Sequence, residues 1–215
     1  MTKYTLYIHC WEAFGEKYNH TGFTLEETTE NGSSTRTIDL SKDKITGNII
    51  FNYDNTGTGG DIAIGRVPVL TGSDAVAAFN KITIATSILD SYQLDYGHLT
   101  SNCNSSTEVL IDNFVPGWKG RAGEIFDQLP GFYVGDEYNR FRNNPYVQQA
   151  LNNANAVIEQ LTEAGIDLGS SALKWLNTDD GFITFDIDGT PYMIDKDGRL
   201  YEKGDDGLYL SLIHI

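Results

Sequence analysis

The sequence predicts an α+β fold, with helices packed on an antiparallel sheet and a β-hairpin extension at the C-terminal end. Three observations lead to this prediction. Residues 3–10 alternate and are rich in Tyr and Ile, and further strand-like runs follow as far as residue 70. Apolar residues then follow helical spacing from Ser73 to Tyr92. From Gly181, short β-type runs are separated by Asp-Gly and Gly-Asp pairs, which favour hairpin turns.

The first third of the chain reads as a β-meander. Strands are expected at residues 3–10, 20–27, 35–41, 47–53 and 61–70. The ENGSS sequence at 30–34 is a turn between the second and third strands. The glycine-rich run at 55–61 is expected to be a flexible loop rather than a P-loop, because no Gly-Lys-Ser/Thr follows it.

Three helices are expected after the meander. Ser73 is the expected N-cap of the first, and the second starts near Asn102 or Cys103. The third covers residues 145–165, with Pro145 in its first turn and Gly165 at its C-terminal cap.

The irregular residues 115–144 come between the second and third helices. We therefore expect a core over residues 1–114 and a helical and β-hairpin extension over 115–215, packed together as one compact domain.

The charge balance excludes several classes of partner. The formal net charge is -15, from 30 acidic and 15 basic side chains. Nucleic acid binding and attachment to anionic membranes are therefore disfavoured, because both need clustered Lys and Arg. The N-terminus has no long apolar run, so a secretory signal is not expected. No segment approaches the length of a membrane span, so no transmembrane segment is expected either. The expectation is a soluble protein, cytoplasmic at synthesis, whose export would use a route independent of a signal peptide.

The two cysteines, Cys10 and Cys103, are too few for a disulfide framework. Without a Cys-x-x-Cys pair, a metal site built on thiolates is not expected, and no cofactor is predicted. A single bridge between Cys10 and Cys103 is one possibility. The other is that one cysteine is a nucleophile.

Cys103 has the sequence context of a nucleophile. It lies between a polar loop and the first turn of an amphipathic helix. Backbone N–H groups at a helix N-terminus favour the thiolate and can also hold the oxyanion of an acyl-transfer intermediate. The polar neighbours on both sides of Cys103 are unusual for a cysteine that serves only as a small core residue.

The general base is predicted to be His20, with His98 as the second choice. His20 opens a strand, and Gly22 after it leaves room for a substrate or another backbone. Asp39, on the next strand, is the candidate for orienting the imidazole. Glu26 and Glu27 are weaker candidates because they lie on the same strand as His20.

The segment from Tyr96 through Leu99, Thr100 and Asn102 to Cys103-Asn104 resembles the nucleophile segment of circularly permuted papain-like hydrolases. These include NlpC-type peptidases, PPPDE isopeptidases and lecithin:retinol acyltransferase-like enzymes. Their His-x-Gly strand is similar to His20-Thr21-Gly22 and precedes the cysteine. The resemblance covers roughly residues 4–114, and it implies that Asn102 and Tyr96 help to position the oxyanion or the substrate.

The resemblance implies a cysteine peptidase or amidase that cleaves a peptide or amide bond through an acyl-enzyme. A peptide or acyl group would be its substrate. A bacterial cell-wall peptidase or a delivered effector toxin fits a small acidic chain of this kind, and the producing cell would then carry a protective, immunity-type protein. The alternatives are a lipid acyltransferase or phospholipase with the same dyad, and a non-catalytic β-rich binding module.

Overall fold

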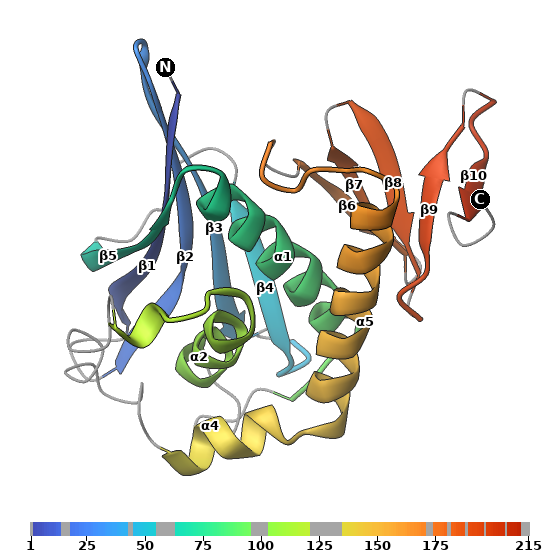
Figure 1. Cartoon of the computed structure of the whole chain (residues 1–215). Helices are drawn as coiled ribbons and strands as arrows, with labels where there is room; N and C mark the ends of the chain where they lie inside the picture. Colours follow the sequence, from blue (N-terminus) through green and yellow to red (C-terminus); the bar gives the residue numbers. More distant parts are fainter. Residues whose placement is uncertain are drawn as a thin grey trace.

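The computed structural model contains two five-stranded antiparallel sheets with helices beside them (Figure 1). The α+β class is therefore confirmed. The structure describes residues 2–13, 18–42, 45–54, 63–95, 103–120, 135–170, 174–179, 182–187, 189–195, 197–204 and 206–211.

The first sheet is built by the N-terminal meander. Its strands are β1 (Lys3–Ala13), β2 (Tyr18–Thr29), β3 (Gly32–Lys42), β4 (Ile49–Asp54) and β5 (Ala63–Thr71). The first four are neighbours in chain order, and β5 crosses back to pair with β1. All five expected strands are present, and each observed strand starts or ends a few residues from the expected position.

One face of this sheet is apolar and carries the helices. Leu6 lies opposite Leu25 and Ile8 opposite Phe23, and all four side chains are buried. Since directly opposed residues of an antiparallel pair point to the same face, these positions define the helix face. Helices α1 (Gly72–Ser91) and α2 (Cys103–Phe114) cover it (Figure 1).

The start of α1 differs from the expectation. Its N-cap is Thr71, whose side chain makes no capping hydrogen bond, and Ser73 lies inside the first turn. A buried threonine and a buried serine in the middle of α1, Thr83 and Ser87, donate to carbonyl oxygens four residues earlier. The helix can therefore bury these hydroxyls without leaving them unpaired.

The expectation of irregular structure over 115–144 is wrong for two stretches of this range. A short helical turn covers residues 118–120, and α4 covers Gly135–Arg142. Helix α5 (Pro145–Glu163) follows, and its N-cap Asn144 accepts a hydrogen bond from the Tyr146 backbone N–H. Gly165 has a φ of 80°, as expected for the residue that ends a helix.

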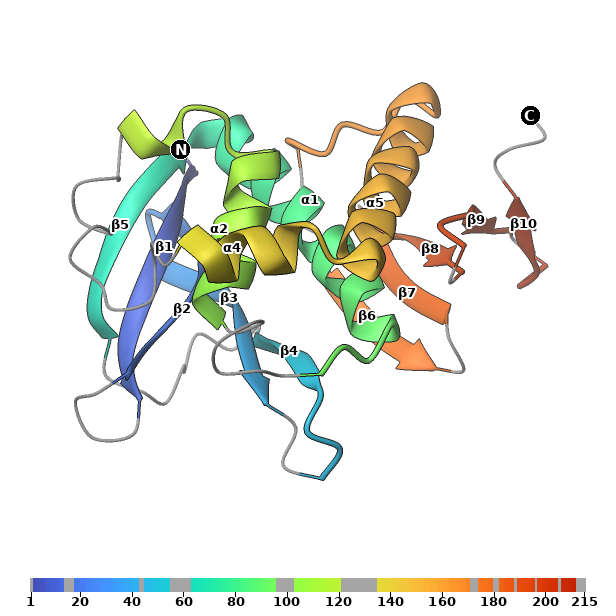
Figure 2. The ribbon, with the colours of Figure 1, turned by 90° about the horizontal axis from the view of Figure 1, so that it is seen from below.

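The second sheet is formed by the C-terminal part of the chain. Its strands are β6 (Lys174–Asp179), β7 (Phe182–Ile187), β8 (Thr190–Ile194), β9 (Leu200–Lys203) and β10 (Tyr209–Ser211), in sequential antiparallel order. The hairpin extension is thus present, and β6 adds a strand that was not expected. Helix α5 lies between α1 and this sheet (Figure 2). Among the described helices, none has the length and apolar character needed to cross a membrane.

Candidate functional site

Cys103 is the first residue of α2 and is 4% exposed. The structure records it as a thiol rather than as half of a disulfide. Its Sγ donates to the side-chain oxygen Oδ1 of the next residue, Asn104, at 3.7 Å. The predicted nucleophile therefore lies at a helix N-terminus, but its thiol is buried and hydrogen-bonded.

Thr21 of β2 ties the start of α2 to the first sheet. Its hydroxyl lies 2.9 Å from Asn104 Oδ1 and 3.5 Å from the carbonyl oxygen of Cys103. In the other direction, the Thr107 hydroxyl donates to the carbonyl oxygen of Thr21 at 3.4 Å. A single strand residue thus fixes the first turn of α2 next to Cys103.

The first turns of α2 are buried although they are polar. Asn104, Ser105, Ser106, Thr107 and Glu108 are each at most 6% exposed. Buried polar groups need hydrogen-bond partners, yet the Ser106 hydroxyl finds none among the described residues. An ordinary amphipathic helix would turn such residues to solvent, so this end of α2 is enclosed by other parts of the chain on its polar side as well.

The backbone of His20 lies in β2 opposite Trp11, directly before Thr21. The His20 side chain is outside the described residues, so its pairing with Cys103 stays a prediction. Tyr96, Asn102 and the alternative base His98 also lie outside the described residues.

Asp39 is in contact with His9. Its Oδ1 lies 3.0 Å from His9 Nε2, while His9 Nδ1 lies 2.6 Å from the Thr24 hydroxyl. This carboxyl–imidazole–hydroxyl chain occupies the face of the sheet opposite the helix face, because the intervening positions point to the helices. His9 is therefore separated from Cys103 by the sheet. The prediction that Asp39 orients His20 remains a prediction.

Gly22 makes the contact between His9 and Asp39 possible. It lies on β2 between them, opposite His9 on β1 and opposite Asp39 on β3. A Cβ at this position would lie 3.2 Å from His9 Nε2, 3.0 Å from Asp39 Oδ1 and 2.5 Å from the Ile38 carbonyl oxygen. The space that Gly22 leaves is therefore occupied by a side-chain bridge, whereas the sequence suggested room for a substrate or another backbone.

A second polar cluster lies further along α2. Asp112 accepts hydrogen bonds from Trp118 Nε1 and from the Tyr138 hydroxyl, both at 2.6 Å. Lys119 Nζ lies 3.4 Å from Asp112 and 3.8 Å from Glu108. Burial raises the pKa of Glu108 to about 7, with Lys119 opposing the rise and Asp112 adding to it. These contacts join α4 and the 118–120 turn to α2.

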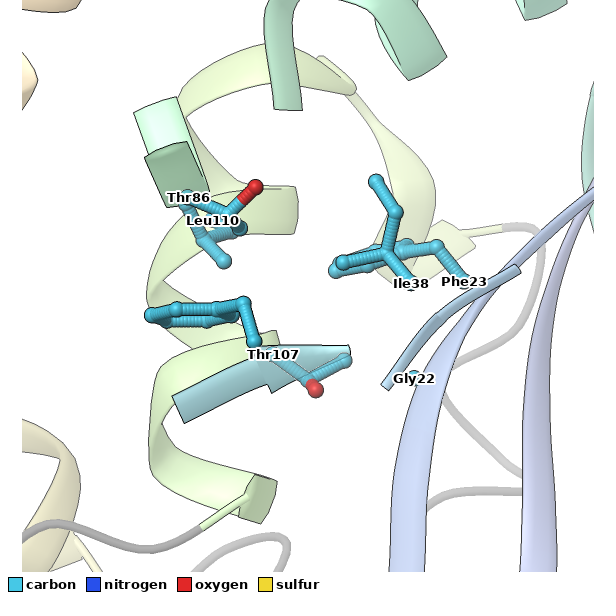
Figure 3. A pocket seen from close by; sticks show the side chains of 7 residues that line it. Gly22, Phe23, Ile38, Thr86, Thr107 and Leu110 are labelled. Atoms are coloured by element: carbon cyan, nitrogen blue, oxygen red, sulfur yellow. The ribbon is translucent and has the colours of Figure 1, made fainter. Parts of the chain in front are cut away.

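A small pocket lies between α2, α1 and the sheet (Figure 3). Its volume is about 10 Å³, about the least that can hold one water molecule. It is lined by Gly22, Phe23, Ile38, Phe51, Thr86, Thr107 and Leu110. This space is too small for a peptide or an acyl chain.

Thr21 and Asn104 were not identified as site residues from sequence. Both stand beside predicted ones, since Thr21 follows His20 and Asn104 follows Cys103. The unusual run of polar residues after Cys103 was the available signal, but which strand residue meets it depends on the tertiary fold. Comparisons with protein-family models, with curated proteins and with solved structures give no match for this chain.

Proposed function

We propose that this protein is a thiol hydrolase in which Cys103 attacks a peptide or amide carbonyl. The observation that carries the proposal is the position of Cys103 at the start of α2, hydrogen-bonded to β2 at the residue after His20. A cysteine helix packed on an antiparallel sheet, with a histidine strand earlier in the chain, is the order that a permuted papain-like core requires.

The proposed mechanism is covalent. His20 takes the proton of the Cys103 thiol, and the sulfur attacks the carbonyl carbon. The C–N bond then breaks to leave a thioester, and His20 gives its proton to the leaving amine. Backbone N–H groups of the first turn of α2 hold the oxyanion. Water then hydrolyses the thioester and restores the thiol. The pairing of β1 with β2 continues without a register shift as far as Ala13↔Tyr18. The proposed mechanism therefore requires the first residues of β2 to depart from regular strand alternation when Cys103 reacts.

The first test compares hydrolysis by the wild type, Cys103→Ala and His20→Ala, with Cys10→Ala as the matched cysteine control. Fluorogenic peptide, isopeptide and acyl-ester substrates are used in parallel. We expect Cys103→Ala to abolish turnover, His20→Ala to reduce it by at least about 100-fold, and Cys10→Ala to leave it unchanged. Hydrolysis that survives in Cys103→Ala would rule out this proposal.

The substrate class is tested separately. Bacterial cell wall is the substrate that we propose for the peptidase, with a protective protein in the producing cell. Incubation of purified wall with the wild type should release soluble peptides or amines, and Cys103→Ala should release none. If the wall stays intact under conditions in which a peptide substrate is cleaved, cell wall is excluded as the substrate. The proposal of a peptidase would still hold.

The lipid-directed alternative gains no support from the described surface. The exposed large apolar side chains there are Ile45, Tyr146, Phe182, Leu208 and Leu210, and none of them lies on α2 or β2. The non-catalytic alternative is favoured by one observation, which is the burial of the Cys103 thiol. It predicts that Cys103 reacts with iodoacetamide as slowly as an ordinary buried thiol.

A further inference from the structure

The hydrogen bond from Cys103 to Asn104 has a direction that matters for catalysis. The thiol donates, and the side-chain oxygen Oδ1 of Asn104 accepts, at 3.7 Å. An acceptor beside a thiol stabilises the protonated form, and the same oxygen beside a thiolate would repel it. This contact therefore opposes the preference for the thiolate that the helix N-terminus provides.

Asn104 is itself held in place. The same Oδ1 atom accepts from the Thr21 hydroxyl at 2.9 Å, and the side chains of Asn104, Thr21 and Cys103 are all buried. Thr107 in turn donates to the Thr21 carbonyl oxygen. The orientation of the amide is thus set by β2 and by the next turn of α2, so it is not free to follow the sulfur.

We propose that Asn104, fixed by Thr21, holds Cys103 in its thiol form at rest, and that the Asn104 side chain must turn away before the thiolate forms. This inference rests on the proposed function, because it describes how the proposed nucleophile, Cys103, is regulated. Asn104 acts through Cys103 and is a positioning residue. Substrate that displaces the amide would let the proton leave Sγ for the general base.

The test measures thiolate formation directly by its ultraviolet absorbance as a function of pH. The protein carries Cys10→Ala, so that only Cys103 contributes, and Cys103→Ser in the same background serves as the blank. We expect Asn104→Ala to lower the pH midpoint of thiolate formation by about one unit, the size of one hydrogen bond. Thr21→Val should lower it by less, because it removes only the group that orients the amide.

Two further variants make the result specific. Asn104→Asp places a negative charge beside Sγ and should raise the midpoint. Asn113→Ala is the matched control, because Asn113 lies on the same helix and its side chain donates to the Val109 carbonyl oxygen rather than to the first turn. It should leave the midpoint unchanged. If Asn104→Ala does not fold, the midpoint of Thr21→Val tests whether Asn104 holds Cys103 in its thiol form.

A pH midpoint that is unchanged or raised in Asn104→Ala would overturn this inference. If Asn104→Ala does not fold, an unchanged or raised midpoint in Thr21→Val would overturn it. Its failure is distinguishable from failure of the proposed function. A shifted midpoint without any hydrolysis by the wild type would support the role of Asn104 and reject the hydrolase. Hydrolysis that depends on Cys103, with no shift, would do the reverse.

Discussion

Gly22 has no side chain, and this allows residues on the two neighbouring strands to meet across β2. His9 and Asp39 come from β1 and β3, and their bond passes over the glycine. The sequence predicted that a substrate or another backbone approaches at Gly22, whereas the groups that meet there are two side chains. The partner in that approach was not predictable, because it depends on the pairing register of three strands.

Replacing Gly22 with alanine tests this packing. The new Cβ would meet the Ile38 carbonyl oxygen at 2.5 Å, a backbone atom that can move only with its strand. We expect Gly22→Ala to lower the free energy of unfolding by roughly 2–3 kcal/mol, as overpacking in a tight site does. Urea denaturation followed by circular dichroism measures the change.

Gly65→Ala is the control for Gly22→Ala. Gly65 lies on β5 of the same sheet, and its added Cβ would have open space around it. Its free energy of unfolding should change by less than about 0.5 kcal/mol. Equal losses in the two variants would show that the clash and the His9–Asp39 bridge do not matter for stability.

Helices and strands in which apolar residues follow a clear spacing were predictable from sequence. Elements without such spacing were not. Helix α5 follows from its apolar spacing, its Pro145 start and the glycine after its end. Strand β6 reads Lys-Trp-Leu-Asn-Thr-Asp, a mostly polar run that becomes a strand by pairing with β7. Helix α4 is short and polar, and its Tyr138 is anchored by a hydrogen bond to Asp112 of α2.

The α2 helix was predicted to start near Cys103, and this is confirmed. The hydrogen bonds that surround its first turn were beyond sequence reasoning. Thr21 and Asn104 are 83 residues apart in the chain, and nothing local requires them to meet. Local spacing therefore predicted where the candidate nucleophile lies on its helix, but not which groups touch it.

The buried carboxyl of Glu108 makes the stability of α2 depend on pH. Its pKa is raised from 4.5 to about 7 in the folded state, mainly by burial. The folded protein thus binds this proton more tightly than the unfolded chain does. The stability that Glu108 contributes is complete below pH 4.5 and is lost as the pH rises to about 7.

Glu108→Gln removes this titration. Relative to the wild type, we expect the variant to gain stability on going from pH 4.5 to pH 8, by on the order of 2 kcal/mol. Denaturation midpoints across this range measure it. Glu159→Gln, an exposed change on α5, is the control and should follow the wild-type profile. A Glu108→Gln profile parallel to that of the wild type would contradict the assignment.

Helix α5 connects the two halves of the molecule. Its buried side chains include Val157 and Leu161, and the helix packs against α1 and reaches β9 of the second sheet. The Asn80 side chain of α1 adds a buried hydrogen bond, at 2.8 Å, to the carbonyl oxygen of Leu168 after α5. We therefore expect the two sheets to unfold together.

Leu161→Ala tests this coupling. The side chain is fully buried, so its truncation should cost roughly 2–4 kcal/mol. The variant should lose its folded structure in a single transition, seen alike by far-ultraviolet circular dichroism and by tryptophan fluorescence. Leu210→Ala, which changes a side chain that is 60% exposed, should be nearly neutral. Two separate transitions in Leu161→Ala would show that the sheets are independent units.

The bridge over Gly22 also has a consequence for how the chain folds. A one-residue slip of β2 would move each of its side chains to the other face of the sheet, so the buried apolar face already opposes such a slip. If β2 slipped by one position against its neighbours, Thr21 or Phe23 would take the place of Gly22 beneath His9 and Asp39. Either side chain would block the bridge. Gly22 thus adds a second penalty against misalignment of β1, β2 and β3, in addition to that of the apolar face.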